Sequence, residues 1–276
     1  MKLYVVSDLH LEESSFAPPQ QTVKAADVIV LPGDIHPGMY GIRWARDVFG
    51  DKPIVYVAGN HEYWHGDWDL TLAEIRTAAK ECGVHFLENE SVVIDGVRFL
   101  GCSLWTDYEY FGADRKKDAI KSAKSYLPDY DYVTVDAGRE FLTPEHTIAR
   151  HKESLAWLTS ELNTEFVGST VVVTHHFPHK HSCNPAHAAS MNTAAYGSKL
   201  PEELLRRSHL WLHGHTHHNA SYRVGDSKSY VRVMCNPRGV PYLWYSSYEN
   251  EAFNPHLLVE QLPDGNWAEH YKEGAK

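Results

Sequence analysis

Several short apolar segments of the chain end just before residues of metal-binding types. The segments comprise residues 3–6, 28–31, 54–58, 171–173 and 210–212. Their length and their content of Val, Ile and Leu predict strands covered on both faces of a largely parallel sheet. The sequences that follow them are Asp8-Leu9-His10, Gly33-Asp34, Gly59-Asn60-His61-Glu62, His175-His176 and Gly214-His215-Thr216-His217. Because ligands collect beyond the carboxyl ends of strands in open α/β sheets, we expect these five loops to meet in one crevice of the sheet.

The residue types in these loops indicate a site for two divalent metal ions. They offer carboxylate, imidazole and amide groups and no thiolate, a set that favours Mn, Fe, Co, Ni or Zn over soft metals. Asp34 is the natural bridging ligand, since its two carboxylate oxygens can each bind one ion of a pair roughly 3.5 to 4 Å apart. Asp8 and His10 lie two positions apart at a strand end, so their side chains project to the same side. We therefore expect a dinuclear metal centre.

The order of the motifs, D-x-H, G-D, G-N-H-E, H and G-H-x-H, resembles the calcineurin-like metallophosphoesterases. The motifs span residues 8 to 217. The resemblance implies an α/β fold, a four-layer α/β/β/α sandwich of two mixed β-sheets flanked by helices. It also implies two ligand sets: Asp8, His10, Asp34 and His217 for one ion, and Asp34, Asn60, His215 and one histidine of the 175/176 pair for the other.

Three further assignments concern the neighbours of these ligands. His175 follows its strand most directly, so we expect it to be the ligand, with His176 close by. The resemblance implies that His61 is not a ligand but a catalytic residue that faces the phosphoryl group and the leaving oxygen. His36, His176 and Asn192 are candidate substrate contacts.

The resemblance and the ligand types together predict a hydrolase. We expect a dinuclear metal-dependent phosphoesterase that hydrolyses small phosphodiesters or phosphomonoesters by in-line attack of a metal-bridging hydroxide. His61 would stabilise or protonate the departing oxygen. The alternatives are a nuclease and a non-catalytic scaffold of the same fold, although every motif is present, which favours an enzyme.

Composition narrows the partners and the location. The chain has 276 residues, of which 43% are hydrophobic, and a net charge of -10. No basic run stands out, so we expect a small phosphorylated substrate and no extended nucleic acid. No apolar stretch approaches the roughly 20 residues of a membrane helix, and residue 1 leads directly into the first expected strand, so we expect no membrane partner and a cytoplasmic protein. The sequence does not indicate an oligomeric state.

The motifs feed one site, so we expect a single domain over residues 1–276, with a lid or insertion at about 105–143. The aromatic residues at the start of that insertion fit a partly helical cover over the site, and equally well simple packing on the flank of the domain. The long loop at 176–200 carries three further histidines, and substrate contact is its expected role. Thr143 and Pro144 predict the start of a helix. Residues 222–224, 230–234 and 257–261 are expected strands of a second sheet.

Overall fold

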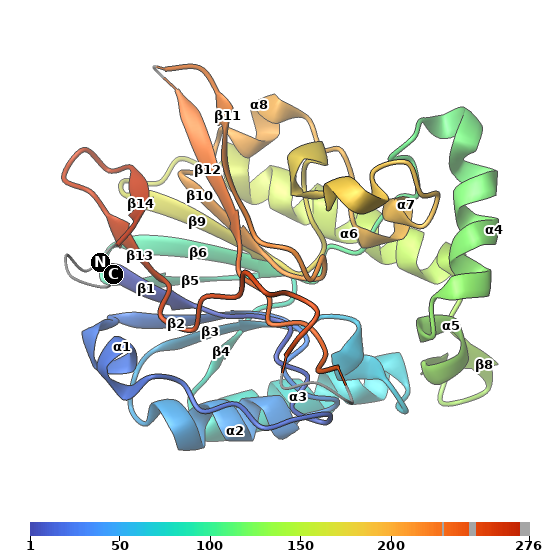
Figure 1. The fold of residues 1–276 in the computed structure, drawn as a ribbon, viewed down its shortest axis with the longest axis horizontal. Coiled ribbons are helices and arrows are strands. Elements are labelled where there is room, and N and C mark those ends of the chain that lie inside the picture. The colour runs from blue at the N-terminus through green and yellow to red at the C-terminus, as the bar shows by residue number, and fades with distance from the viewer. Residues whose placement is uncertain (228, 243–246, 271–276) are drawn as a thin grey trace.

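The computed structural model describes residues 1–227, 229–242 and 247–270. Its centre consists of two six-stranded β-sheets that pack face to face (Figure 1). The first sheet has the order β14 (Trp267–Glu269), β13 (Leu258–Gln261), β1 (Lys2–Val5), β2 (Val28–Pro32), β3 (Ile54–Val57) and β4 (His85–Phe86). The second has the order β11 (Ala220–Gly225), β12 (Tyr230–Cys235), β10 (Leu210–His213), β9 (Ser169–Thr174), β6 (Val97–Cys102) and β5 (Glu90–Ile94). Both sheets are mixed, because antiparallel strands lie at one edge of the first sheet and at both edges of the second, while the other strands are parallel.

Helices cover the outer face of each sheet (Figure 1). The first sheet is covered by α1 (Gln20–Ala25), α2 (Tyr40–Phe49) and α3 (Trp68–Cys82), and the second by α6 (Pro144–Asn163) and α8 (Glu202–Leu205). The remaining elements, α4 (Lys116–Tyr126), α5 (Asp129–Tyr132), α7 (Thr193–Tyr196) and the hairpin of β7 (Thr134–Val135) and β8 (Glu140–Phe141), lie toward one end of the sheets. This arrangement confirms the expected four-layer sandwich.

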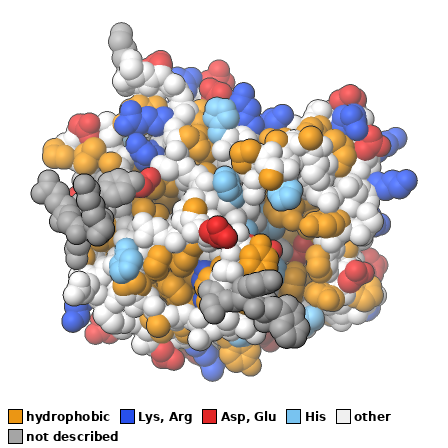
Figure 2. Space-filling model, viewed as in Figure 1, with side chains coloured by type: hydrophobic (Ala, Val, Ile, Leu, Met, Phe, Trp, Pro, Cys, Tyr) orange, Lys and Arg blue, Asp and Glu red, His pale blue; other side chains and the backbone are white. Residues whose placement is uncertain are grey.

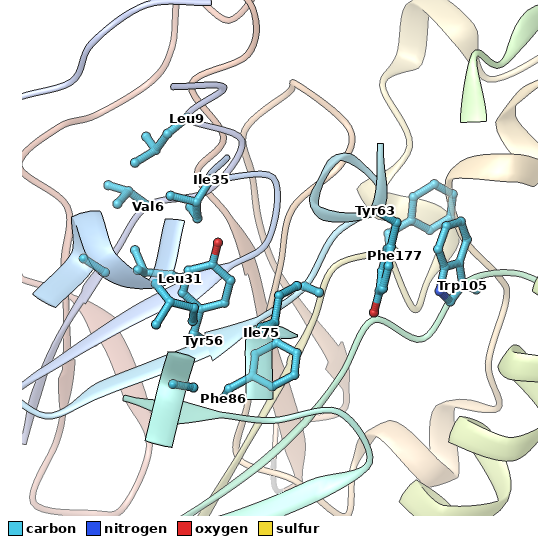
Figure 3. Packing of buried hydrophobic residues seen from close by; sticks show 14 of the residues in the cluster. Val6, Leu9, Leu31, Ile35, Tyr56, Tyr63, Ile75, Phe86, Trp105 and Phe177 are labelled. Atoms are coloured by element: carbon cyan, nitrogen blue, oxygen red, sulfur yellow. The ribbon is translucent and has the colours of Figure 1, made fainter. Parts of the chain in front are cut away.

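Alternating residues of the buried strands separate the core into layers. Leu3 and Val5 of β1 point into the layer between the sheets, whereas Tyr4 packs with the helices on the outer side. Figure 3 shows that the outer cluster continues from Leu31, Tyr56 and Phe86 to Tyr63, Trp105 and Phe177 near the strand ends. The core thus extends as packed aromatic side chains to the end of the sandwich where the motif loops lie.

The structure corrects two expectations about the strands. The strand at 257–261 is β13, which pairs antiparallel with β1 in the first sheet and does not join the second. The strands before His175 and His215 are β9 and β10, which belong to the second sheet. The five motif loops therefore come from two facing sheets and not from one. Hydrophobic patterning identifies buried strands but does not say which of two sheets each one joins.

Two elements outside the motifs show how local sequence determines structure. Helix α6 begins at the expected point, where Pro144 occupies the first turn and the backbone N–H of Thr143 donates to Nδ1 of His146 at 3.2 Å. The β5–β6 hairpin was not predicted, although Asp95-Gly96, with φ of 46° and 79°, is a two-residue turn of the type that favours hairpins. In the described part of the chain, no helix combines the length and apolar character needed to cross a membrane.

Candidate metal centre

The motif loops hold most of the expected ligands in an uncommon backbone conformation. Asp8, His10, Asp34, His215 and His217 all have positive φ values, from 43° to 70°. Non-glycine residues rarely adopt this left-handed region, and such strain concentrates at functional sites. The motif glycines allow the loops to approach each other: a Cβ on Gly59 would lie 2.1 Å from Oδ1 of Asp34. The backbone is therefore shaped to bring these side chains together.

The first group of converging side chains consists of Asp8, His10 and His217. Nε2 of His10 lies 3.0 Å from Nε2 of His217, which in turn lies 3.5 Å from Oδ1 of Asp8. The opposite nitrogen of each ring faces a carboxylate: Nδ1 of His10 lies 3.3 Å from Glu12, and Nδ1 of His217 is bonded to Glu249. Because a carboxylate only accepts, each Nδ1 carries a proton, and each ring, when neutral, presents its Nε2 lone pair to the other.

The second group consists of Asp34, His175 and His215, with Asn60 beside them. Nδ1 of His175 donates to the carbonyl oxygen of Pro32 at 2.8 Å, which leaves Nε2 as an acceptor in the neutral ring. That Nε2 lies 3.3 Å from Oδ2 of Asp34 and 3.2 Å from Oδ1 of Asn60, two further acceptors.

In both groups, acceptor atoms face one another without a donor between them when the imidazoles are neutral. Such an arrangement is repulsive unless a cation lies between the atoms. Carboxylate, imidazole and amide ligands, with ring Nδ1 atoms held by carboxylates or a carbonyl, form the donor set and outer support that divalent metal ions take in proteins. The residues therefore fit two metal ions, with Asp34 placed between the groups.

Without a metal ion, the charge of the buried carboxylates is balanced by protons on two histidine rings. Burial raises the pKa of Asp34, but attraction to His175 and His61 outweighs it and holds that pKa well below its ordinary value. Burial lowers the pKa of His175, while Asp34 raises it more, to about 9. For His217, burial also lowers the pKa, but hydrogen bonds to Asp8 and Glu249 bring it to about 10. Protons on these two rings balance the carboxylates when metal is absent.

We therefore expect metal loading to release protons. Metal ligation requires neutral imidazole, and both His175 and His217 are protonated at pH 7.5 in the metal-free protein because their pKa values lie above that pH. Binding of two ions should release about two protons per chain. Affinity should rise with pH steeply up to about pH 9 and less steeply up to about pH 10. Calorimetric titration with Mn²⁺ in two buffers of different ionisation enthalpy measures this number. Equal heats in both buffers would contradict the assignment.

His61 lies beside both groups, at the start of a 3-10 turn, His61–Tyr63, after β3. Its Nδ1 lies 3.1 Å from Oε1 of Glu12, its backbone N–H donates to Asp34 at 2.9 Å, and its ring stacks on Trp64 with centroids 3.5 Å apart. One of its ring nitrogens also lies within 4.8 Å of possible ligand atoms of His10 and Asp34, so the three side chains could share a metal ion. Burial lowers the pKa of His61, but Asp34 and Glu12 raise it above its ordinary value. The geometry accommodates a proton donor and also a metal ligand at this position.

The candidate substrate contacts lie in different places. Asn192 lines a cavity of about 720 Å³ that opens beside the metal-binding groups. His176 is buried, with Nδ1 3.1 Å from the carbonyl oxygen of Ser103 and its ring against Trp105 and His215. His36 packs on Tyr40, and its Nδ1 lies 2.9 Å from the carbonyl oxygen of Pro37. Neither His176 nor His36 is among the described residues that line the cavity.

The two adjacent histidines of the fourth motif can be separated by experiment. His175 belongs to the Asp34 group, whereas burial and the adjacent His175 lower the pKa of His176 to about 3 and leave it neutral behind His215. We expect His175→Ala to lose about one of two ions per chain, while His176→Ala retains both. Metal analysis after dialysis gives the counts. If the two variants exchange these results, His176 is the ligand.

Four acidic residues that sequence reasoning missed support the site. Three of them accept hydrogen bonds from residues of the site: Glu12 from His61, Asp129 from Asn60, and Glu249 from His217. The buried Glu62 accepts from the backbone N–H groups of Asp34, Ile35 and Gly59 and from the Tyr56 hydroxyl, at 2.7 to 2.9 Å. Glu62 therefore ties the second motif loop to the third. Two of these residues could have been identified from the sequence, because Glu62 ends the Gly59-Asn60-His61-Glu62 motif and Glu12 lies two positions after His10. Asp129 and Glu249 lie outside the motifs, and no local signal identifies them.

Residues of the 105–143 and 176–200 segments form much of the cavity wall. Residues 126–129, from the end of α4 to the start of α5, line one side, and seven residues between 183 and 196 line another. The 105–143 segment is partly helical, and its Tyr108 and Tyr110 are buried in the outer core cluster. Residues of this segment therefore pack against the outer core cluster and also line the cavity.

Comparisons with known proteins identify a family and similar solved structures. A family model described as calcineurin-like phosphoesterase matches residues 1–219. A phosphopantetheinyl hydrolase from Mycobacterium tuberculosis has a similar structure, with a TM-score of 0.65 and 19% identity over 87% of this chain and 90% of that one. A dimetal phosphatase from Danio rerio gives a TM-score of 0.47 and 14% identity over 94% and 91% of the two chains. The comparison with curated proteins gives no match.

The chain belongs to the calcineurin-like phosphoesterase family, since the match covers most of its length. Membership in this family and the converging histidines and carboxylates define a metal-dependent phosphoesterase.

Proposed function

We propose that the protein is a dinuclear metal-dependent phosphoesterase that hydrolyses small phosphomonoesters or phosphodiesters. The observation that carries the proposal is the convergence of acceptor atoms in two adjoining groups, Asp8/His10/His217 and Asp34/His175/His215. Asn60 completes the second group through its Oδ1 atom. Asp34 supplies the carboxylate between them. Divalent manganese, iron, zinc, cobalt and nickel all suit these ligands.

Two bound ions would supply a water-derived nucleophile at neutral pH and would neutralise charge on the phosphoryl group. His61 provides the proton for the leaving oxygen. Because its Nδ1 is directed at Glu12, its Nε2 is the atom available to substrate. Burial raises the pKa of Glu12, but hydrogen bonds from His10 and His61 lower it to about 2, so Glu12 is ionised and favours the protonated His61 ring. Stacking on Trp64 fixes the ring plane.

The cavity supports a small substrate in preference to a nucleic acid. Its volume of about 720 Å³ falls within the range of sites for small molecules. Histidine and acidic side chains lie near the centre of the face in Figure 2, and lysine and arginine side chains lie mainly toward its edges. A nuclease would need cations along the path of the phosphate backbone.

A hydrolysis assay tests the proposal. The protein is stripped of metal with a chelator, reloaded with Mn, Co, Ni or Zn, and assayed with p-nitrophenyl phosphate and bis-p-nitrophenyl phosphate. We expect hydrolysis of at least one substrate that disappears on chelation and returns with metal. A protein that binds two ions but hydrolyses neither substrate, nor simple alkyl phosphates, would be the non-catalytic scaffold. Cleavage of DNA or RNA alone would identify a nuclease.

A further inference from the structure

Among the described residues that line the cavity beside the metal-binding groups, there is no lysine or arginine, and the basic side chains are histidines. The outer part of the wall offers amide and hydroxyl groups and aromatic rings, including those of Asn184, Ser190, Asn192, Thr193, Trp64 and Tyr196. These groups can hydrogen-bond a neutral polar molecule, but they carry no positive charge that would pair with an anion.

Two carboxylates on the same wall reinforce this character. Asp129 accepts from the side-chain amide of Asn60 at 2.7 Å and from the indole N–H of Trp64 at 2.8 Å. Glu249 is bonded to His217. Both residues line the cavity beside the metal-binding groups, where they add negative charge to its wall. Apart from the histidines, the described wall offers no cation, so a second anion on the substrate would face these carboxylates without a cationic partner.

We propose that the substrate of this phosphoesterase carries one anionic group, the scissile phosphoryl, on a neutral polar organic group with an apolar face. The inference rests on the proposed function and specifies its substrate class. The amides and hydroxyls bind the polar atoms of that group, and Trp64 and Tyr196 contact its apolar face. Esters with a second phosphate or a carboxylate on the organic group are poor substrates.

A matched pair of esters tests the proposal on the metal-loaded protein. 4-(Carbamoylmethyl)phenyl phosphate and 4-(carboxymethyl)phenyl phosphate have nearly the same shape and similar leaving oxygens, but only the second carries an additional negative charge. We expect kcat/KM to be about tenfold or more higher for the amide. Equal values for the two esters would overturn the substrate class while leaving the phosphoesterase intact. If neither ester nor p-nitrophenyl phosphate is hydrolysed, the proposed function itself fails.

A variant of the wall provides the reciprocal test. His187 lines the cavity with an exposed side chain, and the hydrogen bonds that hold its turn use its backbone atoms. His187→Lys places a cation on the wall without disturbing those bonds, and His187→Gln is the neutral control. We expect the lysine variant to raise kcat/KM for the carboxylate ester and so to lower the ratio of kcat/KM between the amide and the carboxylate. The glutamine variant should preserve that ratio. An unchanged ratio in both variants would contradict electrostatic selection by the wall.

A separate observation concerns how the 105–143 segment acts on the metal centre. The single oxygen Oδ1 of Asp129 accepts from both Asn60 and Trp64, and Asp129 is buried. The bond from Nδ2 of Asn60 orients the amide so that its Oδ1 points at His175. The bond from Trp64 holds the indole that stacks on His61. One carboxylate from outside the motifs therefore contacts a candidate ligand directly and the candidate proton donor through Trp64.

We infer that Asp129 is a positioning residue that fixes the amide of Asn60 for the second metal ion. Asp129→Asn lets the Asn60 amide rotate, because the new side chain can accept or donate. Asp131→Asn, the same change on an exposed residue of α5, is the matched control. Trp64→Phe removes the other donor but retains a ring beside His61.

The readout is metal content together with the thermal unfolding midpoint. We expect Asp129→Asn to retain about one ion per chain after dialysis that leaves two in the parent, with little change in the midpoint. Asp131→Asn and Trp64→Phe should keep two ions. If Asp129→Asn also keeps two ions, or if it loses both together with its folded structure, the positioning role is refuted.

Discussion

Asp34→Asn should remove nearly all turnover and weaken both metal sites while the fold persists. Among the described residues, Asp34 is the carboxylate that lies near ligands of both groups, and its Oδ2 lies 3.3 Å from Nε2 of His175. Neutralising it removes the charge that both ions share. A loss of about 4 kcal/mol of transition-state stabilisation lowers kcat/KM about a thousandfold. The measurements are kcat/KM with p-nitrophenyl phosphate, metal content, and circular dichroism to verify folding.

Asp47→Asn is the matched control for this variant, because it makes the same chemical change on the exposed side of α2. It should retain two ions and parental activity. Normal activity and two tightly held ions in Asp34→Asn would show that Asp34 is not the ligand shared by the two ions.

His61→Ala should keep two ions and lose activity in a manner that depends on the leaving group. An alkyl phosphate needs its departing oxygen protonated, so kcat should fall by about 10² to 10⁴. p-Nitrophenolate leaves readily without a proton, so the loss on p-nitrophenyl phosphate should be much smaller. His65→Asn, an exposed histidine four residues away, is the control and should resemble the parent.

Two other outcomes for His61→Ala have distinct meanings. Equal losses on both substrates would point to positioning of the phosphoryl group in place of proton donation. Loss of an ion would make His61 a ligand, which its distance from His10 and Asp34 permits.

The parts of the fold and of the site that could be predicted from sequence are those encoded locally. Buried strands are short apolar runs, and ligand-type residues follow them within two or three positions, so Asp8, Asp34 and His175 were evident without structure. The expected sandwich of two sheets was confirmed. Helix α6 was evident because its Thr143-Pro144 start is a local signal.

The parts that could not be predicted depend on distant contacts. Nothing near β13 indicates that it pairs with β1, which lies more than 250 positions earlier. Asp129 reaches Asn60 across 69 positions, and Glu249 reaches His217 across 32. A carboxylate on a loop or short helix usually faces solvent, so burial and bonding partners had to come from the structure. The same applies to the cavity wall, which combines the 105–143 and 176–200 segments.

Anomalous diffraction from crystals of the protein loaded with Mn²⁺ tests the dinuclear centre most directly. We expect two anomalous peaks about 3.5 to 4 Å apart. One should be bounded by Asp8, His10 and His217, the other by Asn60, His175 and His215, with a carboxylate oxygen of Asp34 next to each. A single peak, or peaks away from these residues at saturating Mn²⁺, would contradict a two-metal phosphoesterase.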